Sequence, residues 1–139
     1  MKAVFICICA LLFAAYAGLR VNLTPSLPRG VYRIVPGTPA RGDIVSFCLR
    51  GEFAALARER GYLGSGSCAN GLRPMLKYLA GLPGDHIPNL IIRTVDTQGR
   101  PLSSRLEHGT VPAGMALVLS DHVGSFDSRY FGCVPLDGL

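Results

Sequence analysis

The sequence predicts a mainly β domain of barrel-like outline with one short helix, preceded by an apolar N-terminal segment. Three observations predict this fold class. The 139 residues include 17 glycines and 10 prolines, a composition rich in turns. Short apolar runs recur between those turn residues, as strands do. The first 20 residues differ from the rest, so the predicted boundaries are 1–20 for the apolar segment and 21–139 for the folded body.

The predicted strands are short apolar runs bounded by turn residues. They cover residues 30–35, 43–49, 75–80, 90–95 and 115–119. The predicted helix covers residues 52–60 (EFAALARER), because Phe53, Leu56 and Ala57 share one helical face. A loop rich in glycine and serine is expected over residues 64–71.

The N-terminal segment, residues 3–19, is uncharged between Lys2 and Arg20. As a helix it would be about 25 Å long, slightly shorter than the hydrocarbon core of a bilayer, and the flanking charges could reach the interfaces. It is therefore either a retained membrane anchor or a cleaved secretory signal, for which residues 15–17 (AYA) would be the cleavage site. Both interpretations place the body outside the cytoplasm.

The charge pattern excludes two classes of protein. Charged residues make up 17% and hydrophobic residues 49% of the chain, which excludes an intrinsically disordered protein. The 14 basic residues exceed the 9 acidic ones, but they are dispersed, so no nucleic-acid partner is expected. Twelve of the basic residues are arginines, and Lys77 is the single lysine of the body. Because lysine can lose its proton when buried whereas arginine cannot, Lys77 is a candidate for chemistry.

The cysteines agree with export. In an oxidising compartment Cys48 and Cys68 could form a disulfide that closes a loop of about 20 residues, although all the cysteines could also be free thiols. Cys7 and Cys9 lie in the apolar segment as packing residues, and Cys133 lies near the C-terminus. No C-x-x-C pair occurs, and neither a metal nor a cofactor is expected.

Two residues could form a nucleophile and its base. Ser26 lies between Pro25 and Pro28, which stiffen the segment and remove backbone donors, although an ordinary turn serine would look the same. In a strand, Lys77 would share a face with Met75 and Leu79, where burial would lower its pKa and make the neutral amine a general base. Serine–lysine pairs are an established nucleophile-and-base arrangement, whereas an edge lysine would simply extend to water.

A third segment, residues 120–132 (SDHVGSFDSRYFG), is dense in hydrogen-bonding groups. It could be a polar loop only. Alternatively His122 could join an aspartate and Ser26 in a histidine triad, although no spacing supports that arrangement. His86 and His108 are expected at the surface or in turns.

These segments together resemble the bacterial type I signal peptidases, and most closely their conjugative-transfer (TraF-type) branch. Four blocks follow in the family's order: residues 24–28 (TPSLP), 41–45 (RGDIV), 77–85 (KYLAGLPGD) and 125–129 (SFDSR). The resemblance implies a signal-peptidase-like β domain anchored at the membrane. It departs from the general signal peptidases at residues 120–122, where Ser-Asp-His replaces the usual Gly-Asp-Asn.

The resemblance also assigns roles to individual residues. It implies that Ser26 is the acylating nucleophile, that Lys77 is its base, and that Thr24 helps to line the oxyanion hole together with the Ser26 N–H. Ser125 would orient the lysine amine. Asp127 and Arg129 would form a charged pair that braces the site, and in the transfer branch the aspartate is also credited with a catalytic role.

The function implied is that of a membrane-anchored serine endopeptidase on the periplasmic face of the bacterial inner membrane. It would process, and in some systems cyclise, a pilin-like precursor for conjugation or type IV secretion, with components of that apparatus as further partners. Two alternatives stay open. One is a general signal peptidase that removes signal peptides from exported preproteins, and the other is an inactive exported assembly module.

Overall fold

The computed structural model describes residues 2, 4–7, 9 and 18–139. Among these residues, no helix is both long and apolar enough to cross a bilayer. Most of the predicted anchor or signal segment, residues 3–19, lies outside the described residues, so this segment stays a prediction. The chain divides into two compact units, Met1–Thr38 and Pro39–Leu139.

The first unit contains a two-stranded antiparallel sheet. β1 (Leu19–Asn22) pairs with β2 (Gly30–Arg33), so that Val21 lies opposite Val31. β2 occupies the first part of the strand predicted over residues 30–35. β1 was not predicted, because its four residues begin at the end of the apolar segment and include Arg20 and Asn22, so they form no apolar run of their own.

The second unit contains a four-stranded antiparallel sheet in the order β3-β4-β5-β6, which confirms the mainly β fold class. Its strands are β3 (Ile44–Phe47), β4 (Met75–Gly81), β5 (Met115–Leu119) and β6 (Val134–Pro135). β4 pairs with both β3 and β5, and it is the longest strand. The predictions for β3, β4 and β5 are confirmed to within a few residues.

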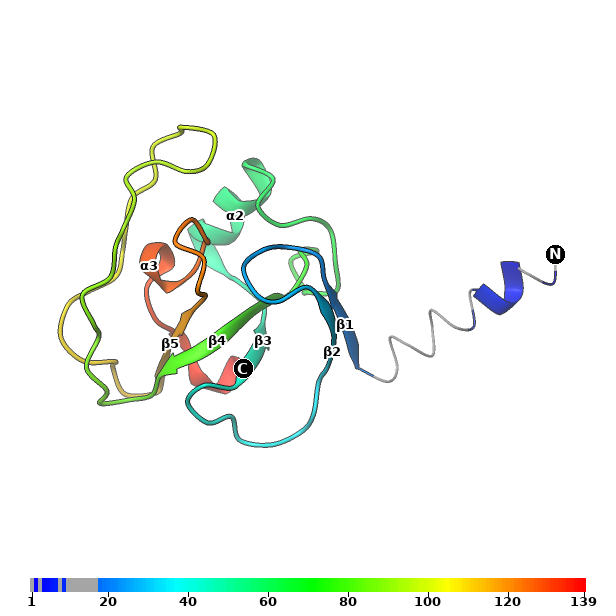
Figure 1. Cartoon of the computed structure of the whole chain (residues 1–139), viewed down its shortest axis with the longest axis horizontal. Coiled ribbons are helices and arrows are strands. Elements are labelled where there is room, and N and C mark those ends of the chain that lie inside the picture. Colours follow the sequence, from blue (N-terminus) through cyan, green and yellow to red (C-terminus); the bar gives the residue numbers. More distant parts are fainter. Residues whose placement is uncertain (1, 3, 8, 10–17) are drawn as a thin grey trace. The chain divides into compact units, whose positions relative to one another are not determined.

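In the second unit, helices lie between strands in the sequence, and a 3-10 turn follows β6. α2 (Gly51–Glu59) is the predicted helix, begins one residue earlier than expected, and buries Ala54 and Ala57. α3 (Ser128–Phe131) and the 3-10 turn η1 (Leu136–Gly138) were not predicted. α3 lies beside β5 (Figure 1).

The main core joins the sheet to these helices. Its buried members come from β3, β4, β5, α2, α3 and the segments beside them: Val45, Phe47, Leu49, Ala54, Ala57, Leu72, Met75, Leu79, Ala116, Val118, Phe131 and Val134. Phe47 and Phe131 pack edge to face, with their ring centroids 6.2 Å apart. Burial of this apolar surface is the dominant stabilising contribution to the second unit.

The chain between β4 and β5 makes a long excursion without helix or strand, coloured light green to yellow-orange in Figure 1. The strand predicted over residues 90–95 is therefore wrong. Ile91 is 75% exposed, and Val95 makes only an isolated bridge, to Pro101. The run is apolar enough for a strand, but no neighbouring strand pairs with it. Asp96 instead accepts hydrogen bonds from the Gln98 and Arg100 N–H groups and closes a turn.

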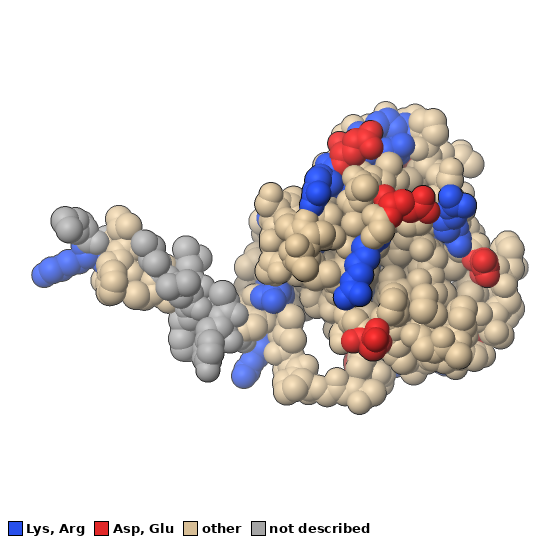
Figure 2. All heavy atoms as spheres, turned by 180° about the vertical axis from the view of Figure 1, so that it is seen from behind, with Lys and Arg blue, Asp and Glu red and all other residues tan. Residues whose placement is uncertain are grey.

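Acidic and basic side chains lie intermixed on the face drawn in Figure 2. Ion pairs in the second unit join Arg41 with Asp85, Arg105 with Glu52, and both Arg60 and Arg100 with Asp96. The pairs of Arg41 with Asp85 and of Arg105 with Glu52 lie at the surface and contribute little stability, whereas the Asp96 side chain is buried in its pairs.

Candidate active site

Ser26 lies in the turn that joins β1 to β2. Its hydroxyl oxygen is 2.9 Å from that of Thr24, and its side chain is only partly buried. Pro25 and Pro28 flank it, and neither has an N–H to give to the turn. Within the described part of the chain, the Ser26 N–H donates to no backbone carbonyl.

Asn22 organises this turn, and sequence reasoning missed it. It is the last residue of β1 and is buried. Its amide nitrogen donates to the carbonyl oxygens of Thr24, Leu27 and Pro28 at 3.1, 3.0 and 3.2 Å. Its oxygen accepts from the Thr24 N–H at 3.2 Å and from the Thr24 hydroxyl at 2.7 Å. The available signal was an asparagine directly before a segment whose prolines leave carbonyl groups without partners.

Lys77 lies at the middle of β4, opposite Val45 of β3. The predicted alternation is confirmed, because Met75, Lys77 and Leu79 are buried while the residues between them are partly exposed. The lysine is 3% exposed, and its Nζ donates to Ser125 Oγ at 2.6 Å. Burial lowers the pKa of Lys77 to about 8, an effect that the negative charge of Asp127 opposes and the positive charge of Arg129 reinforces.

Arg129 holds the loop that carries Ser125 through hydrogen bonds from its guanidinium group. The guanidinium donates to the carbonyl oxygens of Ser120 and His122 at 2.9 and 3.2 Å and to Asp127 Oδ2 at 2.8 Å. The Ser125 N–H in turn donates to the His122 carbonyl at 3.0 Å. One planar side chain with several fixed donors thus ties both ends of the loop to α3.

Asp127 is fully buried and caps the N-terminus of α3. Its Oδ1 accepts from the Arg129 N–H at 3.1 Å, and its Oδ2 accepts from the Ser120 N–H at 3.1 Å. Burial raises the pKa of the Asp127 carboxyl, while these N–H donors and the charges of Arg129 and Lys77 oppose the rise. The cap depends on residues brought together by folding, which explains why α3 was not predicted.

Lys77, Ser125, Asp127 and Arg129 therefore form one buried cluster in the second unit, joined by hydrogen bonds and charge. Thr24 and Ser26 lie together in the first unit. Chemically, the cluster holds an amine whose pKa is close to neutral pH, and the turn presents a partly exposed hydroxyl. The catalytic roles of these residues stay predictions.

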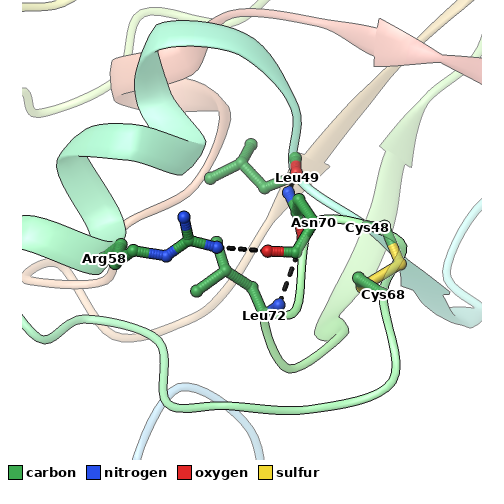
Figure 3. The surroundings of a disulfide bond; sticks show 6 residues. All are labelled: Cys48, Leu49, Arg58, Cys68, Asn70 and Leu72. Atoms are coloured by element: carbon green, nitrogen blue, oxygen red, sulfur yellow. Dashed lines mark hydrogen bonds between the residues drawn. A yellow bond between two sulfur atoms is a disulfide. The ribbon is translucent and has the colours of Figure 1, made fainter.

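Cys48 and Cys68 are joined in a disulfide with their Cα atoms 5.7 Å apart, as predicted. Figure 3 shows that the segment around the bridge is also held by Asn70. Its amide donates to the Leu49 carbonyl at 2.8 Å, its side-chain oxygen accepts from the Leu72 N–H, and its backbone carbonyl accepts from Arg58 of α2. The bridge lies between β3 and β4, in the chain that leads to Lys77.

In the part of the chain that the structure describes, the side chains of two other residues considered from the sequence, His122 and Cys133, make no hydrogen bond to the cluster. The His122 ring is exposed, and its Nδ1 accepts from the Gly124 N–H. Cys133 is a free, partly buried thiol, and burial raises its pKa. A thiol with a raised pKa is a poor nucleophile, so Cys133 is a packing residue.

The model of the family described as signal peptidase, peptidase S26, matches residues 1–102. The chain belongs to this peptidase family, as its sequence motifs predicted. The matched residues include Ser26 and Lys77 and end before Ser125.

Within this family, the similar curated proteins are conjugal and plasmid transfer proteins. The conjugal transfer protein TraF of Agrobacterium tumefaciens (strain 15955) is 40% identical, over 91% of this chain and 80% of that protein. The probable conjugal transfer protein TraF of Sinorhizobium fredii is 36% identical, over 91% of this chain and 75% of that protein. A plasmid transfer protein TraF of Escherichia coli is 35% identical, over 87% and 78%. No solved structure matches the chain significantly.

Proposed function

We propose that the chain is a membrane-anchored serine endopeptidase of conjugative transfer, in which Ser26 is the nucleophile and Lys77 the general base. The observation that carries the proposal is the buried Lys77 amine, bonded to Ser125 Oγ at 2.6 Å. A lysine at the surface would be protonated near neutral pH, whereas a pKa of about 8 leaves a useful fraction of neutral amine. The similarity to TraF proteins supports the conjugative branch.

The reaction would have two acyl-transfer steps. The neutral Lys77 amine removes the Ser26 proton while Ser26 Oγ attacks the scissile carbonyl carbon, and the Ser26 N–H with the Thr24 hydroxyl stabilises the oxyanion. The resulting Lys77 ammonium then gives its proton to the leaving amine, so that an acyl-enzyme forms. Water, or an amine of the same substrate chain, then resolves the ester to a cut or a cyclic product.

Ser125 would orient the Lys77 amine by accepting one of its hydrogens. Asp127 and Arg129 would act through Ser125, because they hold the loop that carries it. A buried carboxylate near the lysine also stabilises the ammonium that forms during the first step.

The proposed substrate is a pilin-like precursor, and the proposed location is the periplasmic face of the bacterial inner membrane. The disulfide between Cys48 and Cys68 supports an oxidising compartment. The transfer proteins among the relatives support a partnership with a conjugation or type IV secretion apparatus.

The test is processing of a co-expressed pilin-like precursor, followed by the mass of the product. Ser26→Ala and Lys77→Ala should each abolish processing in the folded, membrane-associated full chain, because each removes one half of the proposed pair. Ser103→Ala, at an exposed serine, is the matched control and should process normally.

A general signal-peptide precursor in the same assay separates the alternatives. Cleavage of both precursors would indicate a general signal peptidase. Processing that survives Ser26→Ala would disprove the proposed nucleophile, and a wild-type chain that cleaves neither precursor would indicate an assembly module.

A further inference from the structure

The turn that carries Ser26 has little backbone hydrogen bonding of its own. Pro25 and Pro28 lack N–H groups, and the turn joins two strands of four residues each. Three of its carbonyl oxygens converge on the Asn22 side chain, which replaces the missing backbone donors. The Tyr32 hydroxyl adds one donor, to the Pro28 carbonyl, but the Asn22 amide alone contacts carbonyl oxygens on both sides of Ser26, so the position of Ser26 depends on Asn22.

The same contacts fix which way the Asn22 amide faces. Carbonyl oxygens can only accept, so the NH2 group must face those of Thr24, Leu27 and Pro28. The amide oxygen then faces Thr24, where it accepts from both the backbone N–H and the hydroxyl. All five contacts lie within seven consecutive residues of the first unit.

This orientation sets the direction of the hydrogen bond between Thr24 and Ser26. A hydroxyl has one hydrogen, and Thr24 gives its hydrogen to the Asn22 amide oxygen at 2.7 Å. Thr24 can therefore only accept from Ser26 across the 2.9 Å that separates their oxygens. At rest Ser26 donates to Thr24 and Thr24 donates to the Asn22 oxygen, so the lone pairs of Ser26 are not occupied by the Thr24 hydrogen.

We propose that Asn22 is a positioning residue for the nucleophile: it holds the turn and keeps Ser26 a hydrogen-bond donor with its lone pairs free for attack. The inference rests on the proposed role of Ser26. Without the Asn22 oxygen, the Thr24 hydrogen could turn to Ser26 and occupy one of those lone pairs. For attack, Ser26 must turn its one hydrogen from Thr24 to the Lys77 amine, and Thr24 must turn its own hydrogen from Asn22 to the oxyanion.

The experiment uses the full chain in detergent and the p-nitrophenyl ester of N-acetyl-alanyl-alanine as an acyl donor. The rate of p-nitrophenolate release gives kcat and KM separately. Asn22→Ala should lower kcat by about 100-fold, the size expected when a reacting atom is misplaced by about 1 Å, and should leave KM within about twofold. Asn22→Asp keeps an acceptor for Thr24 but places a second oxygen against three carbonyls, so it should lose kcat to a similar extent.

Tyr32→Phe is the matched control. The Tyr32 hydroxyl donates to the Pro28 carbonyl at 2.5 Å, so its loss removes a donor from the same turn without touching the chain from Ser26 to Asn22. This variant should keep kcat within about twofold. In a double-mutant cycle, Asn22→Ala and Thr24→Val should be non-additive, whereas Asn22→Ala and Tyr32→Phe should be nearly additive.

Several outcomes would overturn the inference. A kcat near wild type in Asn22→Ala, while Ser26→Ala and Lys77→Ala are inactive, would disprove positioning and leave the proposed function intact. An effect confined to KM would do the same. If both Asn22 variants fail to fold, as judged by circular dichroism and protease resistance, Asn22 is a folding residue and the inference is wrong. Activity in Ser26→Ala would instead disprove the proposed function.

Discussion

The Ser26 turn and the Lys77 cluster are built by opposite means. The turn is partly exposed, rich in proline and held by the side chain of Asn22, whereas the cluster is buried between β4 and the loop before α3 and contains an ion pair. The difference fits the proposed roles, because a nucleophile must be reached by a substrate and cannot be fully buried, whereas a lysine base needs burial to lower its pKa. Rigidity therefore has to come from local hydrogen bonds in the first case and from packing in the second.

The largest expected loss of activity comes from Lys77→Arg, which keeps the positive charge of the cluster but removes the proposed base. Lys77→Arg cannot accept a proton near neutral pH, so precursor processing should fall by about 10²- to 10⁴-fold. The kcat of the purified variant measures the loss. Arg93→Lys, at an exposed arginine, is the matched control and should process normally. Substantial activity in Lys77→Arg would disprove the role of the amine.

Removal of the negative charge of Asp127 should lower the stability of the fold while leaving the Lys77 amine in place. Asp127→Asn leaves the buried Arg129 guanidinium without its carboxylate, which should lower the free energy of unfolding by about 3–5 kcal/mol. Chemical denaturation measures this loss, and Asp137→Asn, at an exposed aspartate, is the control. Because the Asp127 charge raises the pKa of Lys77, the pH–activity curve should also move to lower pH. An unchanged unfolding free energy would contradict the bracing role.

The depressed pKa of Lys77 makes both activity and stability depend on pH. Activity should rise as the pH passes through about 8, where the amine loses its proton. Between that pH and 10.5, the ordinary lysine value, the unfolded chain binds a proton that the folded chain does not, so the unfolding free energy should rise with pH. The gain across this window should be about 3 kcal/mol.

Lys77→Met supplies the comparison for that pH dependence, because it lacks the titrating amine and should lose the rise in unfolding free energy. His122→Ala should keep both the activity and the pH profile, since the ring is exposed. A loss as large as that of Ser26→Ala would instead support a histidine triad.

The last prediction concerns the disulfide, which belongs to neither the Ser26 turn nor the Lys77 cluster and should affect stability more than activity. Reduction or the Cys48→Ser, Cys68→Ser double variant should lower the free energy of unfolding by about 3 kcal/mol, because the unfolded chain regains the freedom of a closed loop. Mass mapping of exported protein should find these two cysteines joined and Cys133 reduced. A bridge to Cys133 would contradict this connectivity, and unchanged stability would show that the bridge contributes nothing.

Features set by local patterns could be predicted from the sequence. The alternation of Met75, Lys77 and Leu79 predicted which way the lysine points, and the run Met115–Leu119 was bounded correctly because glycine and a polar segment flank it. Residues 90–95 had the same apolar pattern but no partner strand, and pairing depends on the whole fold rather than on the run itself.

Features that depend on groups brought together by folding could not be predicted from the sequence. α3 depends on Asp127, Ser120 and Arg129 meeting in a buried site, and the role of Asn22 depends on three carbonyl groups turning toward it. The family blocks pointed to Ser26 and Lys77, but the chain's own geometry was needed to show what surrounds each of them.

The strand pairings of the second unit also determine when its chemistry can appear. β4 pairs with β3 and β5, and both partners lie far from it in sequence, so the sheet forms only after long loops have closed. The hydrogen bond from Lys77 reaches Ser125, which lies 48 residues further along the chain. A partly folded chain therefore carries an ordinary, protonated lysine. The proposed base therefore depends on a contact between distant parts of the chain, and a molecule in which that contact has not formed would lack it.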